Sequence, residues 1–166
     1  MDRMKILHTG TLDAKAGGPS TSTYLTLKGL VRQGIEAEIF CPPFKNESID
    51  TETFSIHLST QVLKTKLAYS STYKKELEAL GEYDIYHAQG IWQYPTYALI
   101  DTARKKGKPY VITPRGMLYP QDIAKSNRFF KQLSLKLRLL KDLNQAACVH
   151  VTCKEEMVHC RELGVT

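Results

Sequence analysis

Short apolar runs alternate along this chain with longer segments whose apolar residues recur every three or four positions. Each run is five or six residues long, which suits a buried strand of a parallel sheet. The runs are Met4–His8, Ala37–Cys41, Thr53–Leu58, Tyr83–Ala88, Pro109–Thr113 and Ala147–Thr152. The predicted helices are one that begins at Pro19 and ends before Gly34, and the segments Val62–Leu80, Tyr94–Lys106, Asn127–Asn144 and Lys154–Leu163.

This alternation predicts a Rossmann-like α/β fold, with a mainly parallel sheet between two layers of helices. A length of 166 residues suits a single domain with its own core. Within the fourth run, alternation places Tyr83, Ile85 and His87 on one face of the sheet. Thr152 and Glu155 form a Thr-x-x-Glu capping box, which predicts the start of the last helix at Lys154.

Two strand ends and one loop carry the residues with the clearest chemistry. HAQGIW follows the fourth run at His87–Trp92, and VITPRGMLYP spans Val111–Pro120. The loop after the first run contains Gly17 and Gly18. Ligands of open α/β sheets bind beyond the carboxyl ends of the strands, so we expect these three loops to converge on one site.

Arg115 and Gly116 follow the fifth run directly. A guanidinium can bind a phosphate or carboxylate through two parallel hydrogen bonds, and the adjacent glycine lets a ligand approach. The alternative is a surface arginine paired with Asp122. The position at a predicted sheet edge favours ligand contact, so Arg115 is a candidate catalytic residue and Gly116 a candidate binding residue.

His87 and Trp92 each have two interpretations. The His87 imidazole can donate or accept a hydrogen bond near neutral pH, which makes it a candidate catalytic residue, or it can be satisfied within its own sheet. The flat ring of Trp92 suits contact with a sugar ring, or packing beneath a loop.

Gly17 and Gly18 precede Pro19 at the start of a predicted helix. Free N–H groups at a helix N-terminus attract anions, so this loop is a candidate phosphate contact. It matches neither GxGxxG nor a P-loop, and a glycine turn that only connects two elements explains it about as well.

The chain carries a net charge of +6 and has a pI of about 9.1. The segment Lys125–Lys141 contains six basic residues and no acidic one. Such charge favours phosphorylated ligands, anionic lipid or nucleic acid. We expect no nucleic-acid partner, because no basic stretch is interleaved with aromatic residues as single-strand binding requires.

The basic segment Asn127–Asn144 also has an amphipathic pattern. Its apolar residues at helical spacing are Phe129, Phe130, Leu133, Leu137 and Leu140. A basic amphipathic helix can lie on an anionic membrane surface. The commoner arrangement, which we prefer here, is an apolar stripe that faces the core and a charged side that faces water.

The four cysteines are expected to be reduced thiols. No secretory signal precedes them and no apolar run reaches the length of a membrane span, so we expect a cytoplasmic protein. Cys148, His150, Cys153, His159 and Cys160 could be grouped as a metal site. Their spacing matches no common zinc pattern, so we expect no metal, and core packing explains Cys148 in its apolar run.

In order and spacing, these segments resemble the N-terminal half of family 4 glycosyltransferases with the GT-B fold. The resemblance spans nearly the whole chain. It rests on MKILHTG, the Gly17-Gly18-Pro19 loop, HAQGIW, VITPRGML, the basic helix, and HVTCKEEM followed by RELG.

The resemblance implies two Rossmann-like domains that face a cleft, with the acceptor on the N-terminal domain and a nucleotide-sugar on the C-terminal one. Transfer then retains the anomeric configuration, and needs no cofactor and no divalent metal. Residues 1–166 would be the acceptor-side domain, without the donor domain and inactive alone. The implied partners are that donor domain, a nucleotide-sugar, and a glycan or lipid-linked acceptor at the inner face of the cytoplasmic membrane.

By the same resemblance, Gly17 and Gly18 lie against the donor phosphates and the acceptor, and His87 and Trp92 line the acceptor side of the cleft. Arg115 stands where many members have a histidine. Two other classes remain open. One is a standalone nucleotide-binding domain, which the absence of GxGxxG disfavours, and the other is a non-catalytic module that binds a membrane or a partner chain.

Overall fold

The structure is a computed structural model, which describes residues 3–60, 67–125 and 127–166. Six strands form one sheet in which every neighbouring pair is parallel, in the order β3-β2-β1-β4-β5-β6. The strands are β1 Lys5–Thr9, β2 Glu36–Cys41, β3 Ser55–Leu58, β4 Ile85–Gln89, β5 Tyr110–Thr113 and β6 Cys148–Val149. The predicted Rossmann-like α/β class is confirmed.

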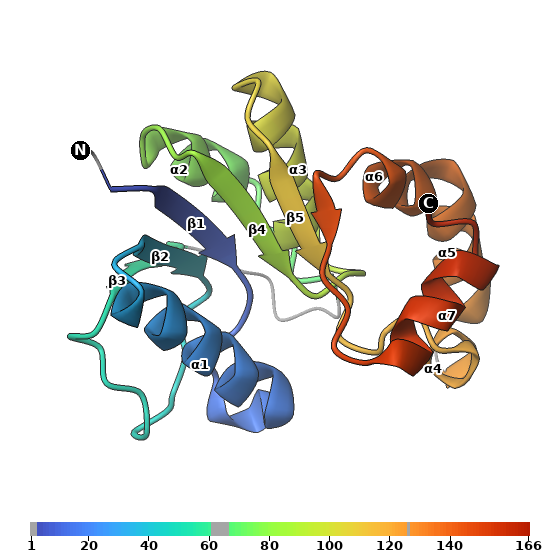
Figure 1. The fold of residues 1–166 in the computed structure, drawn as a ribbon, viewed down its shortest axis with the longest axis horizontal. Coiled ribbons are helices and arrows are strands. Elements are labelled where there is room, and N and C mark those ends of the chain that lie inside the picture. Colours follow the sequence, from blue (N-terminus) through green and yellow to red (C-terminus); the bar gives the residue numbers. More distant parts are fainter. Residues whose placement is uncertain (1–2, 61–66, 126) are drawn as a thin grey trace.

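Helices lie on both faces of this sheet. They are α1 Gly18–Arg32, α2 Tyr73–Ala79, α3 Tyr94–Lys105, α4 Pro120–Lys125, α5 Arg128–Ser134, α6 Leu140–Asn144 and α7 Lys154–Glu162, and a π-helical stretch, Leu135–Leu139, joins α5 to α6. α1 lies on one side of the sheet, α2 and α3 lie on the other, and α4 to α7 gather beyond β5 and β6 (Figure 1).

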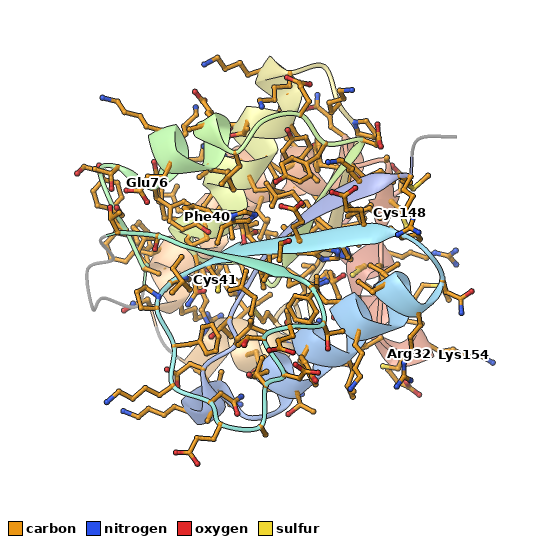
Figure 2. All side chains as sticks on the ribbon, turned by 90° about the vertical axis from the view of Figure 1, so that its left-hand side faces the viewer. Arg32, Phe40, Cys41, Glu76, Cys148 and Lys154 are labelled. Atoms are coloured by element: carbon orange, nitrogen blue, oxygen red, sulfur yellow. The ribbon has the colours of Figure 1, made fainter. Side chains whose placement is uncertain are left out.

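Alternation along the strands divides the apolar side chains between two cores. Phe40 of β2 packs with the cluster between the sheet, α2 and α3, whereas its neighbour Cys41 packs with the cluster beneath α1. Figure 2, which looks onto the β2–β3 side of the sheet, shows these two side chains on opposite sides of the strand. The larger core also receives Leu135, Leu139 and Leu143 from the helix beyond β5.

The strand order reverses at β1. From β1 the chain passes through α1 to β2 on one side, and later returns through α2 to β4 on the other side. The connection that follows β1 therefore runs to one side of the sheet, and the connection that leads to β4 runs to the other side. At such a switch point a crevice forms outside the carboxyl ends of the strands.

Several predicted boundaries need correction. The prediction of a helix over Val62–Leu80 was wrong in length, because α2 covers only Tyr73–Ala79; residues 62–66 lie outside the described part of the chain. The predicted strand Tyr83–Ala88 begins two residues later, at Ile85. Tyr83 is therefore outside the strand, where its ring packs edge-on against Tyr86 at 5.9 Å, so the predicted alternation does not reach it.

The predicted capping box was also wrong. The N-cap of α7 is Cys153, and its side chain makes no capping hydrogen bond. The backbone N–H and the hydroxyl of Thr152 instead donate to Glu156, at 2.6 and 2.8 Å. The carboxylate partner of Thr152 is thus one residue further along than the motif requires.

Candidate functional site

A group of polar side chains lies near the carboxyl ends of the central strands. The parallel register pairs His8 of β1 with His87 of β4, and Gln89 of β4 with Thr113 of β5. Paired positions project to the same face of a sheet, and here that is the face on which Ile39, the partner of His8 in β2, packs under α1. The central strands therefore end in polar residues on the face of the sheet that α1 covers.

Two histidines of this group are buried and in contact. The rings of His8 and His87 lie 4.8 Å apart between centroids. The Gln89 amide donates to His8 Nδ1 at 3.2 Å, and His87 Nε2 is 2.7 Å from Thr113 Oγ1. His8 Nε2 is buried without a hydrogen-bond partner in the part of the chain that the structure describes.

Both imidazoles are neutral at physiological pH. Burial, together with the nearby His150 and Arg115, lowers the pKa of His87 to about 3. Burial also holds the pKa of His8 well below its usual value, with further contributions from His87 and Arg115. A neutral imidazole can orient a hydroxyl but carries no charge. The contact with Thr113 matches the interpretation of His87 as a histidine satisfied within its sheet.

Arg115 connects three elements at this edge. Its guanidinium donates through Nη1 to Ser22 Oγ in the second turn of α1 and through Nη2 to Gln89 Oε1 at the end of β4. Thr23 Oγ1 lies 3.5 Å from Nη2. Among the described residues, Nε of Arg115 has no partner although it is buried. An unpaired buried donor is costly, and such atoms concentrate where a ligand or an ion binds.

The alternative pairing of Arg115 with Asp122 does not occur. Asp122 instead accepts a hydrogen bond from Lys125 at 2.8 Å. Arg115 also has a positive φ of 55°, a conformation that is unusual for a residue other than glycine and that clusters at functional sites. The structure thus brings Arg115, His87 and the first turns of α1 together at one edge of the sheet.

The diglycine loop is open at this edge. Gly17 has a φ of 60° and a ψ of −124°, which favour glycine, and α1 begins at Gly18. Both residues are exposed, and a Cβ atom built on either would meet nothing within 4 Å among the described residues. The first N–H groups of α1 lack helical partners, so this end of the helix can accept an anion.

Gly116 has a structural role that the sequence did not reveal. Its N–H donates to Oε1 of the buried Glu156, whose other oxygen accepts from Thr152. A Cβ at Gly116 would lie 3.1 Å from the ring of Tyr119. Glu156 therefore connects the loop after β5 to the loop after β6. The predicted ligand contact of Gly116 stays a prediction, since its N–H is already used within the protein.

Trp92 lines a different pocket from the Arg115 group. Its indole N–H donates to the carbonyl of Met117 at 3.1 Å, and the Lys131 ammonium lies 5.7 Å from the ring centroid. Beside the ring is a mostly apolar pocket of about 360 Å³, here called the Trp92 pocket, between the β4–α3 loop and α5. Ligand pockets usually have volumes of about 300–1,000 Å³. Trp92 has a positive φ of 68°, like Arg115.

A pocket larger than the Trp92 pocket lies elsewhere. Its volume is about 690 Å³, and it lies between the C-terminal end of α1, β2 and β3. Its lining includes Val31, Ile35, Phe54 and Ile56, and none of the strand-end residues described above. By its size alone, this pocket would be preferred over the Trp92 pocket as a ligand site. We take the edge at Arg115 as the candidate site instead, because polar groups converge there.

The basic helix departs from the preferred interpretation. Leu135, Leu139 and Leu143 face the core, whereas the predicted core-facing residues lie on the outside. Phe129, Phe130, Leu133 and Leu137 are 72%, 70%, 42% and 72% exposed, and Leu140 is partly buried. The prediction of a core-facing stripe was therefore wrong for four of its five residues. These four form what we call the outward apolar face.

The cysteines also differ from expectation. All four are free thiols, but Cys148 is exposed, so the prediction that it packs in the core was wrong. Core packing applies to Cys41 and Cys160, which are buried. Burial raises the pKa of these two thiols to about 12 and about 11. Within residues 3–60, 67–125 and 127–166, no group of three His, Cys, Asp or Glu side chains could hold a metal ion.

Three site residues were missed because no motif marks them. His8, Ser22 and Gln89 become part of the site through the register of β1 with β4 and through the contact of α1 with Arg115. A usable signal was present for His8 and Gln89, because each is a polar residue at or next to the end of an apolar run. Ser22 has no such signal within a helix. Among the described helices, none is long and apolar enough to cross a membrane.

Comparisons with known proteins give one family match. A family model described as "Glycosyl transferase 4-like domain" matches residues 17–166. No curated protein matches the chain significantly.

Two solved structures have a similar fold. One is a putative UDP-N-acetylglucosamine 2-epimerase from Listeria monocytogenes, with a TM-score of 0.56 and 13% identity over 98% of this chain and 42% of the other. The second is the glycotransferase of kitacinnamycin, with a TM-score of 0.52 and 15% identity over 99% of this chain and 42% of the other. The chain therefore spans less than half the length of either structure.

Proposed function

Because the chain belongs to the glycosyl transferase 4-like domain family, with the fold of an N-terminal GT-B domain, we propose that it is the acceptor-binding part of a retaining glycosyltransferase. The complete enzyme moves a sugar from a nucleotide-sugar to a glycan or glycolipid. In this proposal the donor is held largely by a second domain, and residues 1–166 do not catalyse transfer alone. The reaction needs no metal and no cofactor.

One observation carries this proposal beyond the family. A guanidinium, the open N-terminus of a helix and two neutral imidazoles meet at the switch point of the sheet. Donor phosphates gain negative charge as the glycosidic bond to the nucleotide breaks. Fixed donors and positive charge stabilise such charge best when water is partly excluded, as it is around Arg115.

Each residue has a role in this proposal. Arg115 and the open N-terminus of α1 at Gly18 face the leaving phosphate, and Gln89 and Ser22 hold the guanidinium in place. His87, which is neutral, orients an acceptor hydroxyl through the hydrogen-bond network that includes Thr113. Trp92 lines the acceptor side. Gly116 lets the turn after β5 pack closely against the ring of Tyr119, because any side chain at this position would meet that ring.

We also propose that the enzyme is cytoplasmic and acts at the inner face of the membrane, in the assembly of cell-envelope glycans. The support is the helix Arg128–Asn144, whose outward apolar face lies among basic side chains. A module that only binds a partner chain would leave the polar group around Arg115 without a role, and the transfer assay below separates the proposal from a non-catalytic nucleotide-binding domain.

The experiment is a transfer assay with the full-length protein. Nucleotide-sugars are offered one at a time with a mixture of glycan and glycolipid acceptors, and released nucleoside diphosphate is measured. We expect release from at least one donor, with the anomeric configuration of the product retained in its proton NMR spectrum. Absence of release from every donor would refute the transferase, and an inverted product would refute the retaining mechanism.

A further inference from the structure

We propose that the acceptor is a single-chain anionic lipid, whose chain enters the Trp92 pocket and whose charged head pairs with Lys131. This inference rests on the proposed glycosyltransferase function and specifies its acceptor class. Three observations carry it: the chemistry of the pocket, the cation beside it, and the surface with which the pocket is continuous.

The pocket is built to take an apolar chain. Its walls include Leu67, Ile91, Trp92, Tyr97, Met117 and Phe130, and none of its described lining residues is acidic. The indole of Trp92 is fixed by its hydrogen bond to the carbonyl of Met117, so the aromatic wall is pre-formed. A fixed apolar wall binds a chain without the entropic cost of ordering the site.

Lys131 supplies a positive charge at this pocket. Its ammonium lies 5.7 Å from the Trp92 ring centroid and donates to the backbone carbonyl of Asp122. An ammonium has three donors, so two remain for a ligand. The structure shows no carboxylate in an ion pair with Lys131 among the described residues. An apolar cavity with an unneutralised cation at its wall fits an amphiphile with an anionic head.

The pocket is continuous with a surface that suits a bilayer. Phe130 belongs both to the pocket and to the outward apolar face, whose other members are Phe129, Leu133 and Leu137. Arg128, Lys136 and Lys141 on the same helix are exposed, and in the described structure they form no ion pair. A helix that exposes apolar and basic side chains together has the features of a helix that lies on an anionic lipid surface. We therefore assign the source of the ligand to a membrane.

Trp92, the single tryptophan of this chain, allows a direct measurement. Decyl phosphate, kept below its micellar concentration, is titrated into the full-length protein while tryptophan emission is followed. We expect a saturable change in this emission. Binding should be about tenfold tighter for decyl than for octyl phosphate, because two more methylenes are buried. A saturable response to methyl glycosides without a response to decyl phosphate would overturn the proposal in favour of a sugar site.

Charge at the head is tested with matched lysine variants. Lys131→Gln should weaken decyl phosphate binding roughly tenfold and leave decanol binding unchanged, because only the phosphate uses the ammonium. The control is Lys154→Gln, an equal charge change at the exposed start of α7, which should bind decyl phosphate like the original protein. Equal affinities in the two variants would refute the role of Lys131.

The membrane source is tested by flotation of the full-length protein with lipid vesicles. We expect co-flotation with vesicles that contain phosphatidylglycerol and little with pure phosphatidylcholine. The double variant Phe129→Gln with Leu137→Gln should lose most of it, whereas Leu25→Gln, at another exposed leucine on α1, should not. Equal flotation of all three proteins would overturn the assignment to a bilayer.

These outcomes separate the two proposals. If nucleotide-sugars are turned over but decyl phosphate leaves Trp92 emission unchanged, the lipid assignment fails and the transferase stands. If decyl phosphate binds in a Lys131-dependent manner but no nucleotide-sugar is turned over, the transferase fails and the lipid pocket stands.

Discussion

At the scale of single residues, the unusual feature is a set of polar groups placed where a sheet normally buries apolar ones. His8 and His87 occupy central strand positions, and their rings lie tilted against each other near Arg115. The arrangement is costly, because the imidazoles are desolvated and His8 Nε2 finds no partner among the described residues. Such a cost is common at functional sites, where geometry matters more than stability.

This cost predicts a pH dependence of stability. The pKa of His87 is lowered to about 3 in the folded protein, whereas an unfolded histidine titrates near 6.5. Between these values the unfolded chain binds more protons, so the free energy of unfolding should fall as pH drops below about 6.5 and stay level above it. Between pH 7 and pH 5.5 His87 should contribute a loss of about 1 kcal/mol.

The measurement is urea unfolding at a series of pH values for the original protein and for His87→Gln. The variant lacks the His87 titration, so its stability should depend less steeply on pH between 5 and 6.5, although His8 still contributes. Parallel curves for the two proteins would contradict the burial of a neutral His87.

At the scale of elements, the helix Arg128–Asn144 has two apolar sides with different roles. Leu139 is completely buried in the larger core, whereas Leu137, two residues earlier, is 72% exposed. Ion pairs hold the helix beside α3: Arg138 pairs with Asp101, and the buried Asp142 accepts from both Arg104 and Arg138. The helix is thus fixed in the domain by its inner side, which leaves its outer side available.

Two leucine substitutions distinguish these sides. Leu139→Ala should lower the free energy of unfolding by about 2–4 kcal/mol, because it leaves a cavity in the core. Leu137→Ala should change it by less than about 0.5 kcal/mol, because its side chain is already in water. Both values come from chemical unfolding monitored by circular dichroism. A larger loss for Leu137→Ala than for Leu139→Ala would mean that the two sides of the helix are reversed.

The same helix shows what the sequence could and could not predict. Its existence and its bounds followed from the spacing of apolar residues, which is a local property. Which of its two apolar sides faces the core depends on the position of α3 and on the pairing of Arg138 with Asp101, residues 37 positions apart. No local pattern contains that information, so Phe129 and Leu137 were placed in the core in error.

At the scale of the whole molecule, the parallel sheet was predictable because strands and helices alternate along the chain. The convergence of the loops after β1, β4 and β5 followed from the shared carboxyl edge of the strands, and the contacts of Arg115 with Ser22 and Gln89 agree with it. The details did not follow. Glu156, which connects two of the loops, has the appearance of a surface residue in the sequence and is buried only by the tertiary fold.

The length of the chain bears on the function proposed for it. The chain covers 42% of each of the two similar structures described above, and its polar edge is open at the N-terminus of α1. In the proposed enzyme, a donor domain closes over this edge and places its nucleotide-sugar against Arg115, while the acceptor approaches from the Trp92 pocket.

The central claim is that Arg115 stabilises the leaving phosphate during transfer. The most direct test compares kcat/KM for the nucleotide-sugar in the full-length protein, Arg115→Ala, Arg115→Lys and Arg32→Ala, the last at an exposed arginine near the far end of α1. The account predicts a loss of at least about tenfold for Arg115→Ala, or about 1.4 kcal/mol of barrier, partial activity for Arg115→Lys, and values within about twofold for Arg32→Ala. Equal kcat/KM values for Arg115→Ala and Arg32→Ala would contradict it.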